Sequence, residues 1–175
     1  KHFELGHLEN ILEGKFRPGH FQGVCQVVDI LLDIVKPDML FLGEKDFQQC
    51  LVIKKLIRLT GKNISCVICP TLREKGGLAM SSRNMRLGDS ERQQALTIFQ
   101  ALNFMKEQLS TGSLDSLKSK ASSLLEKGGL RPEYVTICRT ADLSEPESWD
   151  GKESVVGLIA CYAGDVRLID NMTLA

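Results

Sequence analysis

Residues 39–70 read MLFLGEKDFQQCLVIKKLIRLTGKNISCVICP, and this stretch predicts a β-strand, an α-helix and a second β-strand. The apolar runs 39–43 and 64–70 are short, and a glycine and a proline end them, as is typical of parallel strands buried on both faces. Residues 45–61 have apolar side chains at helical spacing, and Gly61 supplies a helix stop. The stretch is therefore a βαβ unit with parallel strands and a right-handed crossover.

The regions around this unit predict further helices. Residues 1–16 favour a short helix or loop, and the turn RPGHFQG (17–23) leads into an apolar helix over 24–35. After the second strand comes a polar connection, 71–87, and connections of such length on a parallel sheet are usually functional. An amphipathic helix follows this connection, with Asp89 or Ser90 expected as its N-cap.

The composition changes after about residue 110. A linker turn and a helix ending at Gly128 and Gly129 are expected first, followed by strand-like runs at 133–139, 154–163 and 165–171. The residues Ala163, Gly164 and Asp165 indicate a tight hairpin between the last two runs. Helices followed by antiparallel strands indicate a small α+β domain. We expect an α/β domain over residues 1–86 and an α+β domain over residues 87–175.

The charge balance gives no global attraction to nucleic acid or to an anionic membrane, although a local basic site is compatible with it. The 175 residues contain 22 Lys and Arg and 22 Asp and Glu. No apolar run approaches the length of a membrane span. We therefore expect neither nucleic acid nor a membrane as a partner.

The six cysteines all lie among apolar residues, which predicts buried free thiols in a reducing cytoplasm. Cys66 and Cys69 form a CxxC sequence, but residues three apart on a strand point to opposite faces. A metal pair or a redox pair is therefore not expected.

Polar residues follow both predicted strands, where ligands of open α/β sheets bind. Gly43 would let a ligand approach the backbone, and Lys45 adds a cation near a helix start that already favours anions. Ser81 and Ser82 offer hydroxyls, and Arg83 offers a planar fork suited to phosphate. Together these residues predict a phosphate site. The alternative is a solvated helix start and a plain turn.

Other residues have two possible roles each. His20, in a Pro-Gly turn, is either an acid–base or substrate contact or a structural residue bonded to the backbone. One of Gln48 and Gln49 should face the cleft, where an amide can bind a polar substrate. Gly76 and Gly77 are not followed by the residues of a Walker loop, and no GxGxxG sequence is present, so these two nucleotide motifs are excluded.

Four segments resemble the pantothenate synthetase (pantoate–β-alanine ligase) family in order and spacing. They are RPGHFQGV, PDMLFLGEKDFQQ, LAMSSRN and GDVRLIDN, and the resemblance covers essentially the whole chain. It implies a partial Rossmann-like nucleotidyltransferase sheet followed by a small C-terminal lid domain. The implied reaction is ATP-dependent condensation of pantoate with β-alanine through a pantoyl-adenylate. ATP and Mg²⁺ are implied, as is a homodimer for the full-length enzyme.

The resemblance also implies roles for residues that match its motifs. Lys45 and Arg83 would be catalytic, with Lys45 stabilising charge on the α-phosphate. The ATP contacts would be Gly43, Glu44, Lys45, Asp46, Leu72 and the mobile segment Met80, Ser81, Ser82 and Arg83. Pantoate would contact Gln49 and the valines Val24, Val27 and Val28. Family members often have phenylalanine where this chain has Leu42.

The chain also differs from the family pattern by an absence. The family's N-terminal HxGH motif, a second pantoate-binding glutamine and the acidic metal ligands are not among these residues, which begin KHFELGH without an initiator Met or a signal-peptide core. We therefore expect a C-terminal portion that is inactive alone and has no metal ligands of its own. The alternatives are another adenylate-forming nucleotidyltransferase and a binding module without catalysis.

Overall fold

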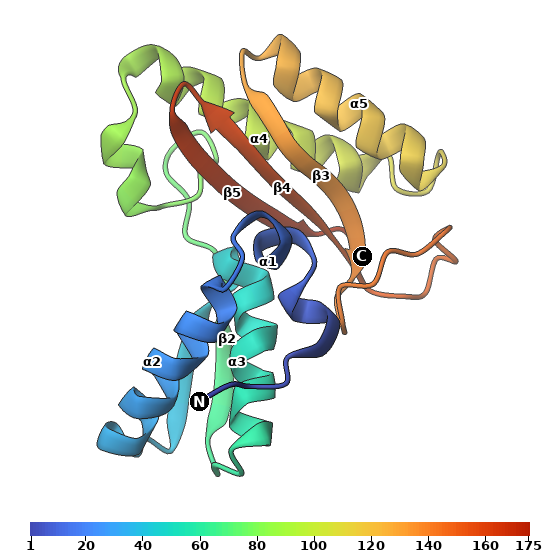
Figure 1. Ribbon diagram of the computed structural model, residues 1–175. Helices are drawn as coiled ribbons and strands as arrows, with labels where there is room; N and C mark the ends of the chain where they lie inside the picture. Colours follow the sequence, from blue (N-terminus) through green and yellow to red (C-terminus); the bar gives the residue numbers. More distant parts are fainter. The chain divides into compact units, whose positions relative to one another are not determined.

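The chain forms two units, Lys1–Pro70 and Thr71–Ala175, in a computed structural model that describes residues 1–175. Each unit has its own sheet (Figure 1). The connection 71–87, which the sequence analysis assigns to the first domain, lies in the second unit. None of the helices is both long enough and apolar enough to cross a membrane.

The first unit confirms the βαβ prediction. Its elements are η1 (Gly6–Glu9), α1 (Leu12–Phe16), α2 (His20–Val35), β1 (Met39–Gly43), η2 (Glu44–Asp46), α3 (Phe47–Leu59) and β2 (Ser65–Cys69). Strands β1 and β2 are parallel, with Met39 opposite Ser65 and Gly43 opposite Cys69. Their carboxyl ends therefore lie at one edge of the sheet.

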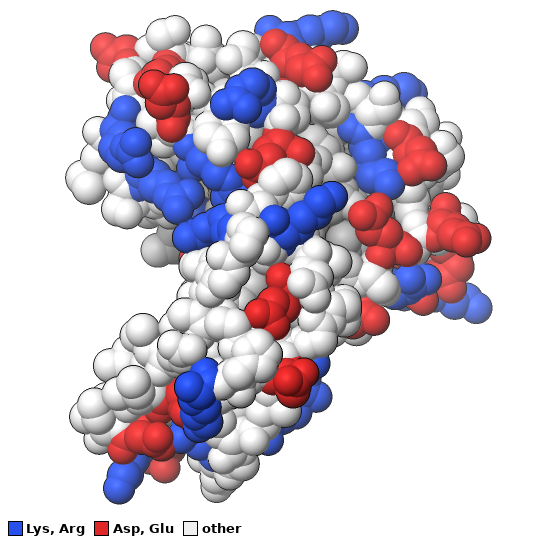
Figure 2. All heavy atoms as spheres, viewed as in Figure 1, with Lys and Arg blue, Asp and Glu red and all other residues white.

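The prediction that β1 is buried on both faces is wrong for these residues. Leu40 and Leu42 pack against the helices α2 and α3, whereas Met39 is 50% exposed and Phe41 is 63% exposed. Successive side chains of a strand point to opposite faces, and the two helices cover only one of them. The outer side of α2 is also apolar and exposed, and Figure 2 shows a largely white surface there.

The second unit is an antiparallel sheet with helices. Its elements are η3 (Ser82–Arg86), α4 (Asp89–Glu107), α5 (Leu114–Lys127), β3 (Arg131–Arg139), β4 (Val155–Ala163) and β5 (Val166–Thr173). The strand order is β3–β4–β5, so β5 is an edge strand. Helices α4 and α5 cover one face of the sheet (Figure 1) and share a core with it that includes Leu102, Met105, Ile137 and Ile159.

One sequence expectation for this unit is wrong, and another is confirmed. The N-cap of α4 is Gly88, not Asp89 or Ser90, because Gly88 is extended with ψ of 170° and the helix begins at Asp89. The Glu91 carboxylate accepts a hydrogen bond from the Gly88 N–H at 2.9 Å. The predicted hairpin is present, with Gly164 and Asp165 between β4 and β5.

All six cysteines are free thiols; four are buried as predicted, whereas Cys66 and Cys69 are partly exposed. Burial raises the pKa of Cys25, Cys50 and Cys138 to about 11, and that of Cys161 to about 12. These four thiols therefore stay protonated at neutral pH and are poor nucleophiles.

Candidate functional site

The first set of predicted site residues lies where β1 ends. Gly43 is the last residue of the strand, and a Cβ built on it would meet no atom within 4 Å. Its φ of −76° is accessible to any residue. Packing and backbone conformation do not require glycine here, so the space beside Gly43 is open to a ligand.

Lys45 lies in η2, directly before helix α3. Its Nζ is 3.7 Å from Asp46 Oδ1, and its side chain is 20% exposed while that of Asp46 is 51% exposed. An ion pair of this length with an exposed partner is weak. The Asp46 side chain makes no capping hydrogen bond to α3, which begins at Phe47. Lys45 thus adds positive charge beside a helix start, and this combination attracts anions.

The two glutamines at the start of α3 have different environments. Gln48 is 3% exposed, donates to Leu8 O and Ile11 O at 2.9 Å each, and accepts from the Glu13 N–H at 3.0 Å. It therefore holds the N-terminal segment in place. Gln49 is partly exposed, and of the pair it is the one accessible to a substrate.

The three predicted pantoate-binding valines do not share one environment. Val24 and Val28 are partly buried against the core formed by α2 and α3. Val27 is 59% exposed. A ligand would thus reach Val27 more easily than the other two.

His20 is the first residue of α2, and its ring contacts Arg17. Arg17 Nη1 lies 3.0 Å from His20 Nε2. Arginine can only donate, so Nε2 accepts and the proton of the neutral ring is on Nδ1. The ring also lies 5.1 Å from that of Phe21. These contacts fix the position of the ring, and a role of His20 as an acid–base or substrate contact stays a prediction.

The second set of predicted residues lies in the connection 71–87 of the second unit. An antiparallel bridge joins Arg73 to Ala79, and Gly76 and Gly77 form the turn between them with φ of 100° and 99°. Ser81 Oγ accepts from the Arg83 N–H at 3.2 Å at the start of η3. The segment therefore has a defined conformation.

The side chains of this connection divide into exposed and anchored ones. Leu72 is 73% exposed and Met80 is 55% exposed, and Ser82 is exposed as well. Arg83 is partly buried, and its Nη1 donates to the Arg167 carbonyl oxygen of β5 at 3.1 Å. The MSSRN segment thus presents hydroxyl and guanidinium groups from a loop that is held at its arginine.

The structure adds residues that the sequence analysis did not single out. Asn84 donates to Glu74 Oε1 at 2.8 Å and to Ala79 O at 3.0 Å, and Arg73 forms an ion pair with Asp170 at 2.6 Å. The available signal was that these residues lie inside or beside the LAMSSRN and LIDN motifs. Arg73 and Asp170 are 97 positions apart in the chain, so neither motif alone could predict that they pair.

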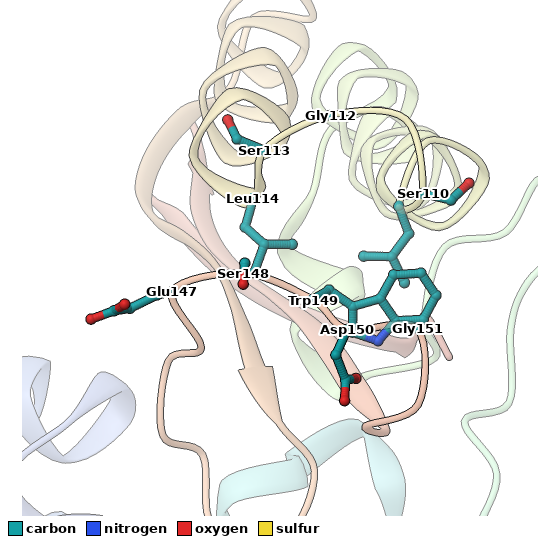
Figure 3. A pocket seen from close by; sticks show the side chains of 10 residues that line it. Ser110, Gly112, Ser113, Leu114, Glu147, Ser148, Trp149, Asp150 and Gly151 are labelled. Carbon is teal, nitrogen blue, oxygen red and sulfur yellow. The ribbon is translucent and has the colours of Figure 1, made fainter.

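A cavity of about 350 Å³ elsewhere in the second unit does not contain the predicted site residues. It lies between the α4–α5 connection and residues 147–151 (Figure 3). No lysine or arginine lines it, whereas Glu147 and Asp150 do. Hydrogen bonds from the backbone N–H groups of Glu153 and Lys152 lower the pKa of Asp150, so its charge persists to acid pH. The acidic lining argues against a phosphate ligand.

No group of three or more His, Cys, Asp and Glu side chains in residues 1–175 is arranged to hold a metal ion. The predicted site residues thus form two separate sets: Gly43–Asp46 with Gln49 in the first unit, and Leu72 with Met80–Arg83 in the second unit.

Comparison with solved structures defines the class of fold. The chain matches a crystal structure of pantothenate synthetase from Thermus thermophilus with a TM-score of 0.90 and 36% identity, over 97% of this chain and 61% of that one. A pantoate-beta-alanine ligase from Francisella tularensis, complexed with beta-gamma ATP and beta-alanine, matches with a TM-score of 0.73 and 34% identity. This match covers 97% of this chain and 56% of that one. The fold is of the nucleotidyltransferase type.

Sequence comparison then gives the family. The family model described as Pantoate-beta-alanine ligase matches residues 1–173. Pantothenate synthetases from Azobacteroides pseudotrichonymphae and Methylococcus capsulatus are 42% and 43% identical over 98% of this chain. The chain belongs to the pantoate–β-alanine ligase family. It spans 61% and 60% of the length of these two relatives.

Proposed function

We propose that the whole protein joins pantoate to β-alanine at the expense of ATP, through a pantoyl-adenylate. Membership of the pantoate–β-alanine ligase family is the observation that carries this proposal. The Francisella tularensis relative is complexed with beta-gamma ATP and beta-alanine, which supports ATP and β-alanine as substrates. The cationic and hydroxyl groups of Lys45 and Ser81–Arg83 are of the types that bind phosphates.

In the first step, a pantoate carboxylate oxygen forms a bond to the α-phosphorus of ATP, and the bond from that phosphorus to the pyrophosphate oxygen breaks. Negative charge grows on the phosphate oxygens during this transfer. Lys45 and Arg83 would stabilise that charge, and Ser81 and Ser82 would hold the phosphates by hydrogen bonds. Gly43 would allow the nucleotide to approach the strand end, where Glu44 and Asp46 would contact it.

In the second step, the amine of β-alanine attacks the acyl carbon, AMP leaves, and the amine loses a proton. The Gln49 amide would hold a polar group of pantoate, because an amide both donates and accepts. Val24, Val27 and Val28 would contact the two methyl groups of pantoate. Leu72 and Met80 would contact the nucleotide from the second unit.

We further propose that residues 1–86 serve nucleotide binding and that residues 87–175 act as a lid. Mg²⁺ would accompany ATP and be held by residues outside these 175. The whole protein would act as a homodimer in the cytoplasm, a compartment that suits six free cysteines. The 175 residues alone are expected to form no pantothenate, because they span 61% of a full-length relative and part of the nucleotide site and the metal ligands are expected outside them.

The variant Lys45→Ala in the whole protein tests the proposal. Removing one preorganised charge-stabilising donor typically lowers kcat by about 10²–10³-fold, and we expect a loss of that size in pantoyl-adenylate formation. The measurement is pyrophosphate release from ATP and pantoate without β-alanine. Lys152→Ala, at an exposed position of the second unit, is the control and should retain full activity. Unchanged adenylation in Lys45→Ala would contradict the role of Lys45.

A further inference from the structure

The outer edge of strand β5 binds two arginines of the connection 71–87. Arg83 Nη1 donates to the Arg167 carbonyl oxygen at 3.1 Å, and Arg73 Nη2 donates to the Asn171 carbonyl oxygen at 3.2 Å. Carbonyl groups an even number of residues apart on a strand point to the same side. Because β5 is an edge strand, these carbonyls have no further strand to pair with. The connection therefore covers the open edge of the sheet.

Arg73 is fixed more firmly than a surface ion pair would fix it. Its Nη1 lies 2.6 Å from Asp170 Oδ2 and its Nη2 lies 3.1 Å from Asp170 Oδ1, which is a bidentate pair. The Asp170 side chain is 4% exposed, and its Oδ1 also accepts from the Asn171 N–H at 2.8 Å. The same guanidinium stacks 4.7 Å above the Phe99 ring and donates to Gly77 O at 2.9 Å. Its planar fork therefore has one orientation.

The residue next to Arg73 in the chain, Glu74, is hydrogen-bonded to the segment proposed to bind phosphate. Glu74 accepts from Asn84 Nδ2 at 2.8 Å and pairs with Arg92 of α4. The second hydrogen of the Asn84 amide goes to Ala79 O at 3.0 Å. Asn84 directly follows Arg83, and Ala79 lies shortly before Ser81. Both ends of the MSSRN segment are therefore attached to the part of the connection that Arg73 orients.

We propose that Arg73 and Asp170 are positioning residues that hold Ser81, Ser82 and Arg83 in the conformation that binds the phosphates of ATP. The proposal rests on the proposed function of this loop. Neither residue is expected to touch the reacting atoms, because the buried carboxylate and the carbonyl groups occupy the arginine fork. Apolar contacts alone would leave the loop orientation less defined, since they lack direction.

The first test measures loop order without any ligand. Hydrogen exchange of the Met80 and Asn84 amides is compared in the wild-type whole protein and in Arg73→Lys, because these amides donate to Leu72 O and Ser81 O. A lysine keeps the charge but cannot form the bidentate pair, so we expect exchange to rise by about tenfold or more. The matched control is Arg139→Lys, because Arg139 at the end of β3 also pairs with a carboxylate, that of Glu153. This variant should leave the exchange rates of the Met80 and Asn84 amides unchanged.

The second test asks whether loop order affects ATP. Arg73→Lys should raise the KM for ATP by about tenfold while the KM for pantoate stays near the wild-type value. Asp170→Asn should have the same effect. If that variant does not fold, the double variant Arg73→Gln with Asp170→Asn replaces the ion pair by two neutral amides and leaves no buried charge unpaired, and it should likewise raise the KM for ATP by about tenfold.

The outcomes separate this inference from the proposed function. Wild-type exchange of Met80 and Asn84 in Arg73→Lys would overturn the inference. Faster exchange with an unchanged KM for ATP would also overturn it, because the pair would then be merely structural. Failure of the wild-type whole protein to consume ATP with pantoate would instead refute the proposed function, and the exchange result alone would then decide whether Arg73 orders the loop.

Discussion

Gly77 has to be glycine for two separate reasons. Its φ of 99° lies in the left-handed range that side chains rarely adopt. A Cβ at this position would also lie 2.1 Å from the nearest atom of the Phe99 ring. The ring of Phe99 in turn supports the Arg73 guanidinium, so this glycine allows the loop to pack closely on α4.

The variant Gly77→Ala should destabilise the second unit by about 3 kcal/mol or more, because backbone strain and a steric clash add. Gly76→Ala is the matched control, because it has nearly the same φ but its Cβ would be 3.2 Å from a flexible Leu96 side chain. It should cost about 1–2 kcal/mol. Urea unfolding followed by Trp149 fluorescence measures both, and equal costs would refute the clash.

In the first unit, the two glutamines at the start of α3 have different roles. Gln48 and Gln49 are adjacent in the sequence, and their type alone gives no reason to choose between them. The structure separates them, because Gln48 makes three hydrogen bonds to the backbone of residues 8–13. A buried amide with such partners is costly to remove, whereas Gln49 is accessible to a substrate.

At the scale of elements, Asp29 joins helix α2 to the connection between α3 and β2. Its Oδ2 lies 2.6 Å from Lys1 Nζ and its Oδ1 lies 3.2 Å from Lys62 Nζ, while its side chain is 7% exposed. The hydrogen bond from Lys1 is the main reason why the pKa of Asp29 is lowered, with a smaller contribution from Lys62 and an opposing one from burial.

This lowered pKa makes the stability of the first unit depend on pH. The contribution is fully present above the unfolded pKa of about 3.9 and is lost as the pH falls through the folded pKa. Asp29→Asn should therefore cost on the order of 2 kcal/mol at pH 7, and the difference from the wild type should shrink below about pH 4. Denaturant unfolding at pH 7, 5, 4 and 3 measures this.

Asp33→Asn provides the control on the same helix. Asp33 also pairs with Lys62, but its side chain is 65% exposed. Exposed pairs contribute little, so this change should cost less than about 0.5 kcal/mol at every pH. A pH-independent difference between Asp29→Asn and the wild type would refute the role of the Asp29 carboxylate.

At the scale of the whole molecule, the first unit exposes several large apolar side chains on α2 and β1. The exposed side chains are Val27, Ile30, Leu31, Ile34 and Val35 on α2 and Met39 and Phe41 on β1. The α2 side chains recur at helical spacing on one side of the helix, and exposed apolar patches of this kind usually mark contact surfaces. In the absence of other chain segments, association between copies would remove this surface from water.

We therefore expect the 175-residue chain by itself to associate with increasing concentration. Ile34 is 72% exposed, and the variant Ile34→Glu should lower the associated fraction, because a buried charge opposes association. Leu124→Glu on α5, where the leucine is 37% exposed, should have little effect. Sedimentation velocity measures both, and a monomer at all concentrations would refute the expectation.

The sequence by itself determined the elements and the family. The βαβ unit and the final hairpin are local patterns, because alternation, helical spacing and glycine or proline stops act over a few residues. It also predicted that Lys45 and Ser81–Arg83 bind phosphate, which stays a prediction. Only the tertiary structure decided that Met39 and Phe41 stay exposed, that Gln48 is structural, and that Arg73 meets Asp170. These outcomes depend on contacts between residues far apart in the chain, and no local pattern contains such contacts.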